Sequence, residues 1–181
     1  MSLRFRDATL EDVPQIAALQ NAAAGALVAQ FGDGPWGGPF SERGVALALR
    51  HARLRVGVEA KRIVCCLRLA QKKPWAIDVA HFTPATRALY LTNMAVAVAH
   101  QRKGVGRHAL DDAKTIVREW PAQSIRLDAW DAPAGAGGFY EACGFISRGA
   151  VVYRGTPLRY YEWLIEQDSA PAHDGSLLRA D

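Results

Sequence analysis

The sequence predicts a single domain of the mixed α/β (α+β) class, in which helices flank a central sheet. Stretches with apolar residues at helical spacing alternate along the chain with short β-prone stretches, and this alternation is typical of a layered fold. With 181 residues, half of them hydrophobic, the chain has enough apolar material for one core and little for a second. We expect the domain to span residues 1–166. A mobile tail is expected over residues 167–181, whose turn-forming and charged residues show no period.

The composition argues against several classes of protein. No apolar run approaches the ~20 residues that a membrane span needs, and the N-terminus lacks the apolar core of a signal peptide. We therefore expect a soluble, cytoplasmic protein without membrane contact. The cysteines, Cys65, Cys66 and Cys143, form neither a C-x-x-C motif nor an even disulfide framework, and we expect reduced thiols. The five histidines show no metal-ligand spacing, so no bound metal is expected.

The charge pattern favours a small anionic ligand over nucleic acid. The net charge of +4 is modest, and basic residues are dense only between Gln101 and Arg107. No arginine-rich or aromatic RNA-binding signature is present, so nucleic acid is not an expected partner. A small polyanion is sufficient to explain the basic cluster.

The N-terminal part of the chain is predicted to form a strand followed by two helices. Residues 3–6 alternate as a short strand, and Thr9 is a plausible N-cap for the first, long helix. That helix ends where four glycines and two prolines predict a loop over residues 32–40. Ser41 then caps a second helix, residues 42–52.

The middle of the chain is predicted to supply the centre of the sheet. Residues 54–59 and 63–69 have the composition of two strands joined by a short turn, which predicts a hairpin. The next strand begins at Leu89. Residues 71–87 contain two prolines and little periodicity, so we expect an irregular connection there and leave one short strand within it open.

A helix and a strand follow this central strand. Apolar residues at helical spacing predict a helix over residues 105–120. Residues 124–130 then alternate with period two. This period divides the side chains between two faces, with Ile125, Leu127 and Ala129 on one and Arg126, Asp128 and Trp130 on the other.

The last elements are a weak helix and two strands. Residues 134–143 form a helical pattern weakened by three glycines and ended by Gly144. Residues 145–153 and 158–165 have the composition of strands. The predicted order is therefore β-α-α-β-β-β-α-β-α-β-β.

The stretch around which this pattern is organised is residues 89–107, where a strand, a glycine turn and a helix follow one another. Gly104 and Gly106 allow the backbone to approach a ligand closely, and the first turn of the next helix has amides without intrahelical partners. These amides and the positive end of the helix dipole suit a phosphate or pyrophosphate. The turn is therefore a candidate anion-binding site.

Two families bind phosphates with such a turn. Residues 104–109, GVGRHA, fit the G-x-G-x-x-G/A dinucleotide fingerprint, and Asp128 closes the next strand about 20 residues on. Against this, several residues separate the strand from the first glycine, and the turn lies past the middle of the chain. Residues 101–106, QRKGVG, instead resemble the Q/R-x-x-G-x-G/A signature of the GNAT superfamily of N-acetyltransferases. Residues 139–145, FYEACGF, resemble the Y-E-x-x-G-F segment of the same family.

The resemblance covers residues 3–165 and implies a GNAT-like mixed, largely antiparallel central sheet that splays open after its fourth strand. In that family the open strand pairs its backbone with the pantetheine arm of the co-substrate acetyl-CoA, and residues 94–96 occupy the matching position here. A plain core strand is the other explanation for these residues, and both can hold. The cofactor-binding residues that the resemblance implies are Met94, Ala95, Val96, Gln101, Arg102, Lys103, Gly104, Val105, Gly106 and Arg107.

Tyr140 and Asp128 are the catalytic residues that the resemblance implies. A phenol with a pKa of ~10 is protonated at neutral pH, so Tyr140 can protonate the departing thiolate, or it can only position the cofactor sulfur. Asp128 lies where some GNAT members carry an acidic base for the incoming ammonium, which acts directly or through water. The alternative for Asp128 is a surface ion pair with Arg126.

The resemblance also bears on several other polar and aromatic residues. Loops beside the first two helices contribute to the acceptor site in GNAT proteins, which makes Trp36 and Phe40 candidates for the substrate wall. Packing of these rings onto the core is the simpler explanation. His81 and His100 are polar candidates near the expected cleft, with structural or solvent-facing roles preferred. Many members have an asparagine where this chain has Pro133, which puts one cofactor contact in doubt.

Together these features predict a cytoplasmic, acetyl-CoA-dependent N-acetyltransferase that transfers acetyl directly to a primary amine of a small molecule, peptide or protein. No cysteine occupies a motif position suited to a covalent intermediate. A non-catalytic CoA-binding or sensing module is the alternative, favoured by Pro133 and disfavoured by Tyr140 and Asp128. An NAD-type dinucleotide binder is the third choice.

The loops do not reveal the identity of the amine, and pairing of an edge strand would allow a homodimer.

Overall fold

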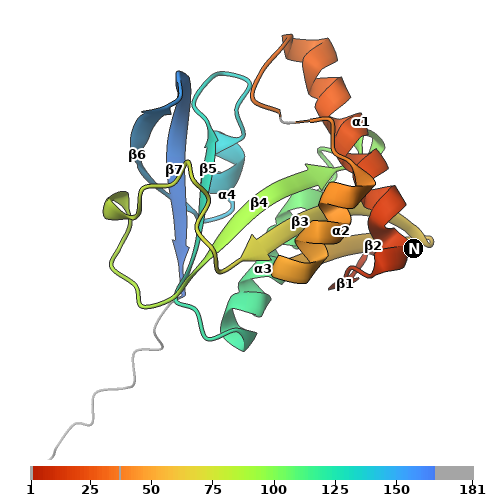
Figure 1. Cartoon of the computed structure of the whole chain (residues 1–181), viewed down its shortest axis with the longest axis horizontal. Coiled ribbons are helices and arrows are strands. Elements are labelled where there is room, and N and C mark those ends of the chain that lie inside the picture. Colours follow the sequence, from red (N-terminus) through yellow and green to blue (C-terminus); the bar gives the residue numbers. More distant parts are fainter. Residues whose placement is uncertain (1, 37, 166–181) are drawn as a thin grey trace, which may run out of the picture.

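A computed structural model describes residues 2–36 and 38–165, and these residues form one seven-stranded sheet (Figure 1). Its strand order is β1-β2-β3-β4-β5-β7-β6, and every neighbouring pair is antiparallel except β4 and β5. The strands are β1 (Arg4–Asp7), β2 (Arg53–Glu59), β3 (Arg62–Ala70), β4 (Ala88–Val96), β5 (Ser124–Trp130), β6 (Ile146–Tyr153) and β7 (Thr156–Leu164). This confirms the predicted mixed, largely antiparallel sheet. It excludes the NAD-type fold, which is built on a mostly parallel sheet.

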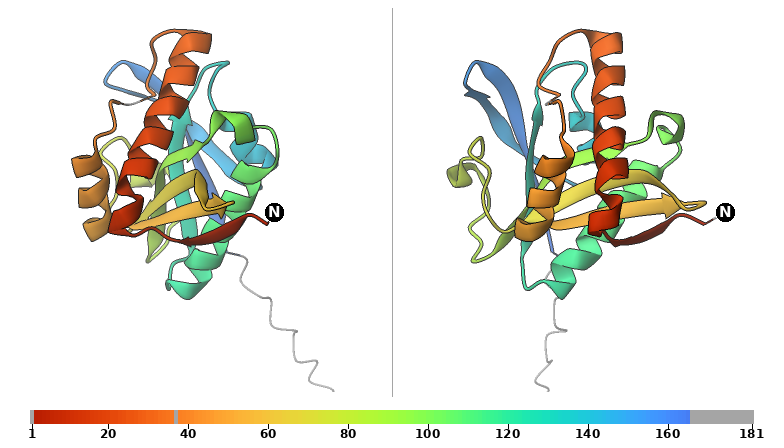
Figure 2. Two further views of the ribbon diagram at one scale, coloured as in Figure 1. Left: turned by 90° about the vertical axis from the view of Figure 1, so that its right-hand side faces the viewer. Right: turned by 45° about the vertical axis from the view of Figure 1, so that its right-hand side comes forward.

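Helices cover both faces of the sheet (Figures 1 and 2). α1 and α2 pack on one face, and α3 and α4 pack on the other. The helices are α1 (Val13–Phe31), α2 (Glu42–His51), α3 (Val105–Glu119) and α4 (Gly137–Ala142), with 3-10 turns η1 (Leu10–Asp12), η2 (Val79–His81) and η3 (Val98–His100). None of the described helices is long and apolar enough to cross a membrane. The tail predicted over residues 167–181 lies outside the described residues.

The two N-terminal helices begin at polar caps. Ser41 caps α2 as predicted, and its Oγ accepts a hydrogen bond from the Gly44 N–H over 3.1 Å. Thr9 lies one turn earlier than the start of α1, because it precedes η1 and its backbone N–H donates to Asp12 Oδ2 over 2.8 Å. The long first helix therefore begins at Val13.

The helix predicted over residues 134–143 is confined to α4. The residues just before it form a tight turn, in which the Gly135 N–H donates to Ala132 O over 2.8 Å. A side chain at Gly135 would collide with the backbone carbonyl of Trp130, so only glycine fits. Of the three glycines that weaken the helical pattern, Gly135 thus belongs to the turn that brings the chain from β5 to α4, while Gly137 and Gly138 begin α4 itself.

β4 and β5 pair only at their starts. The pairing runs from Ala88 and Ser124 to Tyr90 and Arg126, after which the strands diverge (Figure 1). Over residues 91–96, the described partner of β4 is therefore β3 alone. This is the splayed sheet that the resemblance implies, and the site is built at its opening.

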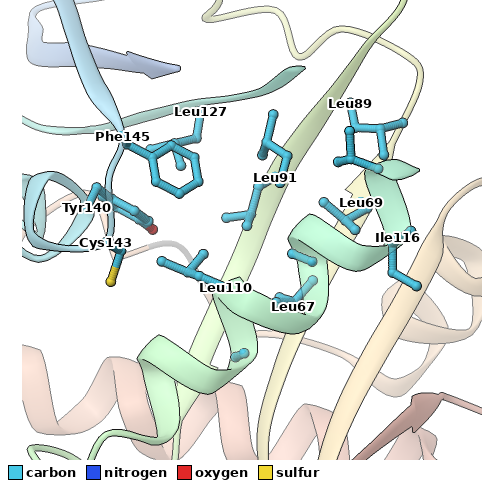
Figure 3. Close-up of a cluster of buried hydrophobic side chains, with 14 of the residues drawn as sticks. Leu67, Leu69, Leu89, Leu91, Leu110, Ile116, Leu127, Tyr140, Cys143 and Phe145 are labelled. Carbon is cyan, nitrogen blue, oxygen red and sulfur yellow. The ribbon is translucent and has the colours of Figure 1, made fainter. Parts of the chain in front are cut away.

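The largest core cluster lies between the sheet and α3 (Figure 3). Leu110 and Ile116 of α3 pack beside leucines of β3 and β4, while Tyr140, Cys143 and Phe145 close the cluster on the α4 side. Burial of one such aliphatic or aromatic side chain contributes roughly 1.5–3 kcal/mol. The cluster therefore holds α4, and with it Tyr140, in a fixed position relative to β4. A second cluster holds α1 and α2 against the other face.

Residues 71–87 are irregular apart from η2, and a buried polar network fastens them to the sheet. Glu162 on β7 is fully buried and accepts hydrogen bonds from Arg126 Nε and Arg148 Nε, each over 2.9 Å. Both arginines also donate to Thr83, whose backbone N–H donates to Glu162 Oε2 over 3.1 Å. A connection without regular structure is thereby held by charge-assisted hydrogen bonds.

The same network shows that one alternative from the sequence is wrong. Asp128 does not form a surface ion pair with Arg126, because Arg126 is only 4% exposed and binds Glu162. Arg126 lies directly opposite Glu162 in the β5–β7 pairing, whereas Asp128 lies opposite Tyr160. Residues directly opposite one another are the nearest side-chain neighbours on one face of a sheet. The charge of Arg126 is therefore neutralised by Glu162 on β7, and Arg126 is not an ionic partner of Asp128.

Candidate active site

Two clefts meet at the gap between β4 and β5, and Tyr140 lines both. The first has a volume of about 810 Å³ and lies among the end of β4, the turn before α3 and the start of α4. The second has a volume of about 540 Å³ and lies among α1, the loop after it, and the ends of β4 and β5. We call them the turn cleft and the aromatic cleft, because the glycine turn lines the first and Trp36, Phe40, Trp130 and Tyr153 line the second.

The turn cleft is built where the chain enters α3. Gly104 is the N-cap of this helix, and its φ of +82° is a left-handed conformation that strains other residues. The first helical hydrogen bond joins His108 N–H to Gly104 O, so the amides of residues 105–107 have no partner within the helix. A Cβ added at Gly104 would meet nothing within 4 Å. The turn therefore presents free amides, and the positive end of a 15-residue helix, to open space that an anion can occupy.

The cofactor-binding residues expected from the resemblance do not all reach this cleft. Val105 is buried in the core beneath the turn, and Lys103 is exposed outside the described linings of both clefts. Ala95 lines the aromatic cleft instead, since successive strand residues point to opposite faces. The expected residues that do line the turn cleft are Met94, Val96, Gln101, Arg102, Gly104, Gly106 and Arg107.

Two side chains of the turn fix its position. Gln101 Nε2 donates to Val96 O over 3.1 Å and so ties the turn to the open end of β4. Arg107 Nη2 donates to Ala142 O at the end of α4 over 2.8 Å. The turn is thus held against both elements with which it forms the cleft.

Gly106 and Pro133 contribute to the turn cleft in different ways. Gly106 serves packing, because an added Cβ would lie 3.1 Å from the ring of Phe139. Pro133 forms part of the wall near α4. It has no backbone N–H and no side-chain amide, so it offers a ligand apolar contact but no hydrogen-bond donor there. The departure from the GNAT pattern at this position therefore removes a polar contact without closing the cleft.

The aromatic cleft has largely apolar walls and a single charge. Trp36 packs edge-on against Trp130, with 5.0 Å between the ring centroids, and Phe40 also lines the cleft. Both explanations of Trp36 hold, since it packs the loop onto β5 and forms part of the wall. Among the described lining residues Asp128 is the only carboxylate, and none is lysine, arginine or histidine.

Asp128 has no ionic partner among the described residues. Burial raises the pKa of its carboxyl group, and only a hydrogen bond from its own backbone opposes this. A carboxylate in such surroundings is a stronger base than an exposed aspartate and attracts a cation. The aromatic cleft can therefore bind an ammonium group and take up its proton.

Tyr140 lies where the two clefts join. Tyr140 is 8% exposed, and its ring packs against Phe139 and Tyr161 and against Phe145, which lies beside it in Figure 3. Burial raises the pKa of its hydroxyl group, and the nearby negative charge of Asp128 raises it further. The phenol therefore keeps its proton across the neutral range. It can act as a hydrogen-bond or proton donor toward either cleft, but not as a base.

The histidines singled out from the sequence lie elsewhere. His81 packs edge-on against Tyr160, with 5.3 Å between the ring centroids, and His100 Nε2 lies 3.2 Å from Glu59 Oε2. Neither lines the turn cleft or the aromatic cleft. The described residues contain no group of three or more histidine, cysteine, aspartate or glutamate side chains that could hold a metal ion.

The three cysteines are buried thiols. Burial raises the pKa of Cys65 to about 11 and that of Cys66 to about 12, and it also raises the pKa of Cys143. Because the thiolate is the nucleophilic form, these thiols are unreactive at neutral pH. The described part of the chain therefore offers no activated cysteine.

Gln20 and Trp130 are among the residues lining the aromatic cleft that were not predicted from the sequence, although each carried a signal. Gln20 interrupts the apolar face of α1 four residues after the fully buried Ile16, where a polar side chain is unexpected. Trp130 lies on the same period-two face of β5 as Asp128. A polar residue within an apolar stripe, and an aromatic residue beside a candidate base, both indicate a cleft.

Comparison with known proteins identifies one family. Residues 33–145, which include the turn, Asp128 and Tyr140, match the acetyltransferase (GNAT) family. No curated protein matches the sequence.

Several solved structures are similar to this chain. The ribosomal-protein-alanine N-acetyltransferase of Brucella melitensis has a TM-score of 0.70 and 17% identity, covering 90% of this chain and 100% of that one. The PaiA N-acetyltransferase of Thermoplasma acidophilum, in complex with coenzyme A, has a TM-score of 0.69 and 11% identity, covering 90% and 100%. The putative acetyltransferase YncA of Salmonella typhimurium, with acetyl-CoA, has a TM-score of 0.68 and 15% identity, covering 96% and 99%. At these identities the likeness establishes the fold alone.

Proposed function

The chain belongs to the acetyltransferase (GNAT) family, and from this premise we propose that it is an acetyl-CoA-dependent N-acetyltransferase that acts directly on a primary amine. The acceptor is an amine of a small molecule, peptide or protein. One observation carries the proposal: Tyr140 lines both clefts, so a single proton donor faces the anion-binding turn on one side and the carboxylate of Asp128 on the other.

The turn cleft suits coenzyme A. The free amides of residues 105–107 and the guanidinium groups of Arg102 and Arg107 match a pyrophosphate, and the unpaired edge of β4 matches the amide groups of a pantetheine arm. Two of the similar structures contain coenzyme A or acetyl-CoA, which supports this ligand. The thioester supplied by acetyl-CoA would lie where the two clefts meet.

The proton movements follow from the surroundings of two side chains. The ammonium form of the amine gives one proton to Asp128, directly or through water, because burial has made this carboxylate more basic. The neutral nitrogen then attacks the thioester carbon, a C–N bond forms and the C–S bond breaks. Tyr140 donates a proton to the departing sulfur, the new amide releases its surplus proton, and solvent restores Tyr140.

Direct transfer is favoured over a covalent acetyl-enzyme. A covalent route needs a nucleophile whose reactive form is populated at neutral pH. The raised pKa values of the buried cysteines argue against that role. Asp128 lines the aromatic cleft, whereas Tyr140 lines both clefts, an arrangement that suits an amine and a cofactor bound at the same time.

Tyr140→Phe tests the proposal most directly. The ring and its packing are kept while the hydroxyl is lost, so kcat for thiol release from acetyl-CoA should fall roughly 100-fold, with little change in acetyl-CoA affinity. The matched control is Tyr90→Phe, a buried tyrosine on β4 that lines neither cleft, for which kcat should be unchanged. A fall of only two- or threefold in Tyr140→Phe would assign Tyr140 a positioning role instead of proton donation.

A non-catalytic CoA-binding module is the second candidate, and Pro133 is the observation that favours it. Two measurements on the wild-type protein distinguish the enzyme from the binding module. Thiol release with a panel of primary amines supports the enzyme. Acetyl-CoA binding by calorimetry, without thiol release from any amine in the panel, would support the sensing module.

A further inference from the structure

We propose that the acceptor is a zwitterion of the amino-acid type with an apolar or aromatic side chain, and that Arg68 binds its carboxylate while Asp128 binds its ammonium group. The inference rests on the proposed function, since it names the amine that the aromatic cleft would take. It is carried by an unpaired arginine, by the sheet register that aligns it with Asp128, and by buried polar atoms without partners beside it.

Arg68 differs from the other shielded arginines. Six arginines among the described residues are buried or half-buried, and five of them bind a carboxylate: Arg53, Arg55, Arg126, Arg148 and Arg159. Arg68 has no salt bridge within the described part of the chain, and its Nε is buried without a hydrogen-bond partner. Shielding a cation without a counterion is unfavourable, so a ligand that supplies a carboxylate would relieve the cost.

The register of the sheet places Arg68 in line with Asp128. Arg68 on β3 lies directly opposite Thr92 on β4, so both side chains share one face. Tyr90 is the last β4 residue paired with β5, opposite Arg126, and Thr92 and Asp128 each follow two residues later. Because strand residues two apart share a face, all three side chains project from the face that bears α1 and α2.

This row crosses the opening of the sheet. With a strand spacing of about 4.8 Å, the backbones of Arg68 and Asp128 lie roughly 10 Å or more apart. The long side chain of Arg68 can shorten that separation. A cation and an anion on the same face, with the splayed gap between β4 and β5 separating them, form a pair of sites that a zwitterion can bridge.

Two further polar atoms near Arg68 are buried without partners. They are Thr92 Oγ1 and Gln20 Oε1, the latter on a side chain that is 6% exposed. Such atoms are normally hydrogen-bonded in folded proteins. The hydroxyl of Thr92 can donate to a carboxylate. The amide nitrogen of Gln20 donates to Asn93 O over 3.5 Å, so its unpartnered oxygen can accept a hydrogen bond from the ligand's ammonium group.

The space beside Arg68 adjoins the aromatic cleft. A crevice of about 230 Å³ between α2 and β3 is lined by Arg68, and it shares Gln20, Phe40 and Asn93 with the aromatic cleft. A carboxylate can therefore occupy the crevice while the rest of the ligand remains in the cleft. There the paired rings of Trp36 and Trp130 favour an apolar or aromatic side chain.

Phenylalanine, phenylalaninamide and phenethylamine test the proposal as a matched series. They share the amine and the ring, and only the first carries a carboxylate. The wild-type kcat/KM should be at least tenfold higher for phenylalanine than for the other two. Arg68→Met keeps much of the side-chain length without the charge, and it should raise KM for phenylalanine at least tenfold while changing kcat/KM for phenethylamine less than threefold.

Arg50→Met is the matched control. Arg50 is exposed and lines a separate depression with Arg68 at the C-terminal end of α2, but not the crevice or the aromatic cleft. KM for phenylalanine should be unchanged in this variant. An equal rise in Arg50→Met and Arg68→Met would place the anion in that depression and overturn the proposal.

Calorimetry of the same three ligands separates this inference from the proposed function. Binding of phenylalanine that is lost in Arg68→Met would support the subsite even if no amine is acetylated. Acetylation of phenethylamine and phenylalaninamide as efficient as that of phenylalanine would overturn the subsite while the N-acetyltransferase function stands. Far-ultraviolet circular dichroism of Arg68→Met verifies that the variant is folded.

Discussion

Asp128 and Glu162 are two shielded carboxylates on neighbouring strands of one sheet face, and they differ in whether the fold supplies them with ionic partners. Glu162 is fully buried and receives two arginines and a backbone N–H. Asp128 is half-buried and has no ionic partner among the described residues. The fold itself supplies the hydrogen bonds and the positive charge that stabilise the Glu162 carboxylate. It supplies no positive charge to Asp128, whose carboxylate can therefore bind a cationic ligand.

The difference matches a structural role for Glu162 and the catalytic role that we propose for Asp128. Glu162 fastens residues 71–87 to the sheet, a part of the chain whose own residues form little regular structure. Asp128 raises the pKa of Tyr140, has its own pKa raised by burial and binds no arginine or lysine among the described residues, which fits the catalytic role that we propose for it. Shielding alone is therefore a poor guide to function, and the presence or absence of a partner distinguishes the two roles.

The largest effect is expected for Glu162→Gln. Removing this charge leaves Arg126 and Arg148 close together and uncompensated, and breaking a buried ion pair in this way costs about 3–5 kcal/mol of unfolding free energy. Urea denaturation measures the loss. Asp131→Asn, which breaks the more exposed pair with Arg159, is the control and should lower the unfolding free energy much less. Equal losses of unfolding free energy in the two variants would show that the buried Glu162 pairs contribute no more to stability than the exposed Asp131 pair.

Asp128→Asn should give the opposite pattern, a large loss of activity without loss of stability. The variant is nearly isosteric but has no carboxylate to bind the ammonium group or accept its proton. KM for the amine should rise, and kcat/KM at neutral pH should fall roughly 100-fold. The deficit should shrink at high pH, where more of the amine is already neutral. Wild-type amine kinetics at every pH would remove Asp128 from the reaction.

The stability of Asp128→Asn follows from the sign of the pKa shift. A carboxyl group whose pKa is raised by folding stabilises the native state below its unfolded pKa. That contribution is lost as the pH rises through the folded pKa. Replacement with asparagine removes this pH dependence, so the variant should be at least as stable as the wild type at pH 7, with no advantage at acid pH. A clear loss of stability at pH 7 would show that the Asp128 carboxylate holds the fold together.

The sequence predicted the helices and strands well where a local pattern was present. The two faces of β5 and the cap at Ser41 are local properties of a few consecutive residues. The partner of Arg126 was not predictable in this way, because Glu162 lies 36 residues later and meets it only through strand pairing. The irregular character of residues 71–87 was predicted correctly, but the contacts that fasten them to the sheet were not, because these contacts depend on side chains of β5, β6 and β7.

For the candidate site, motif spacing pointed to the residues that now line the two clefts, including Tyr140, Asp128 and most of the turn. It did not distinguish Val105, which is buried, from Gly104, which faces open space. Arg68 carried a signal as the one charged residue within the apolar run of residues 63–70 in β3, but only the register with Thr92 relates it to the cleft. Contacts between strands far apart in the sequence decide these roles.

The smallest effect is expected for Gly104→Val, which sharpens the contrast by perturbing the turn cleft while leaving both carboxylates in place. A side chain at a φ of +82° is strained, and it would project into the open space beside the free amides. The dissociation constant for acetyl-CoA should therefore rise about tenfold, equivalent to ~1.4 kcal/mol. Calorimetry measures it.

Gly155→Val is the matched control for this last variant. Gly155 has nearly the same φ, +81°, and equally open surroundings, but it lies in the turn between β6 and β7 and lines neither cleft. Its substitution imposes the same backbone strain, so acetyl-CoA affinity should be unchanged while stability falls to a similar extent in both variants. The pH dependence of kcat/KM for the amine, which we attribute to Asp128, should also be unchanged in Gly104→Val. A change in it would show that the two clefts act as one site. Unchanged affinity in a folded Gly104→Val protein would remove the turn from the cofactor site.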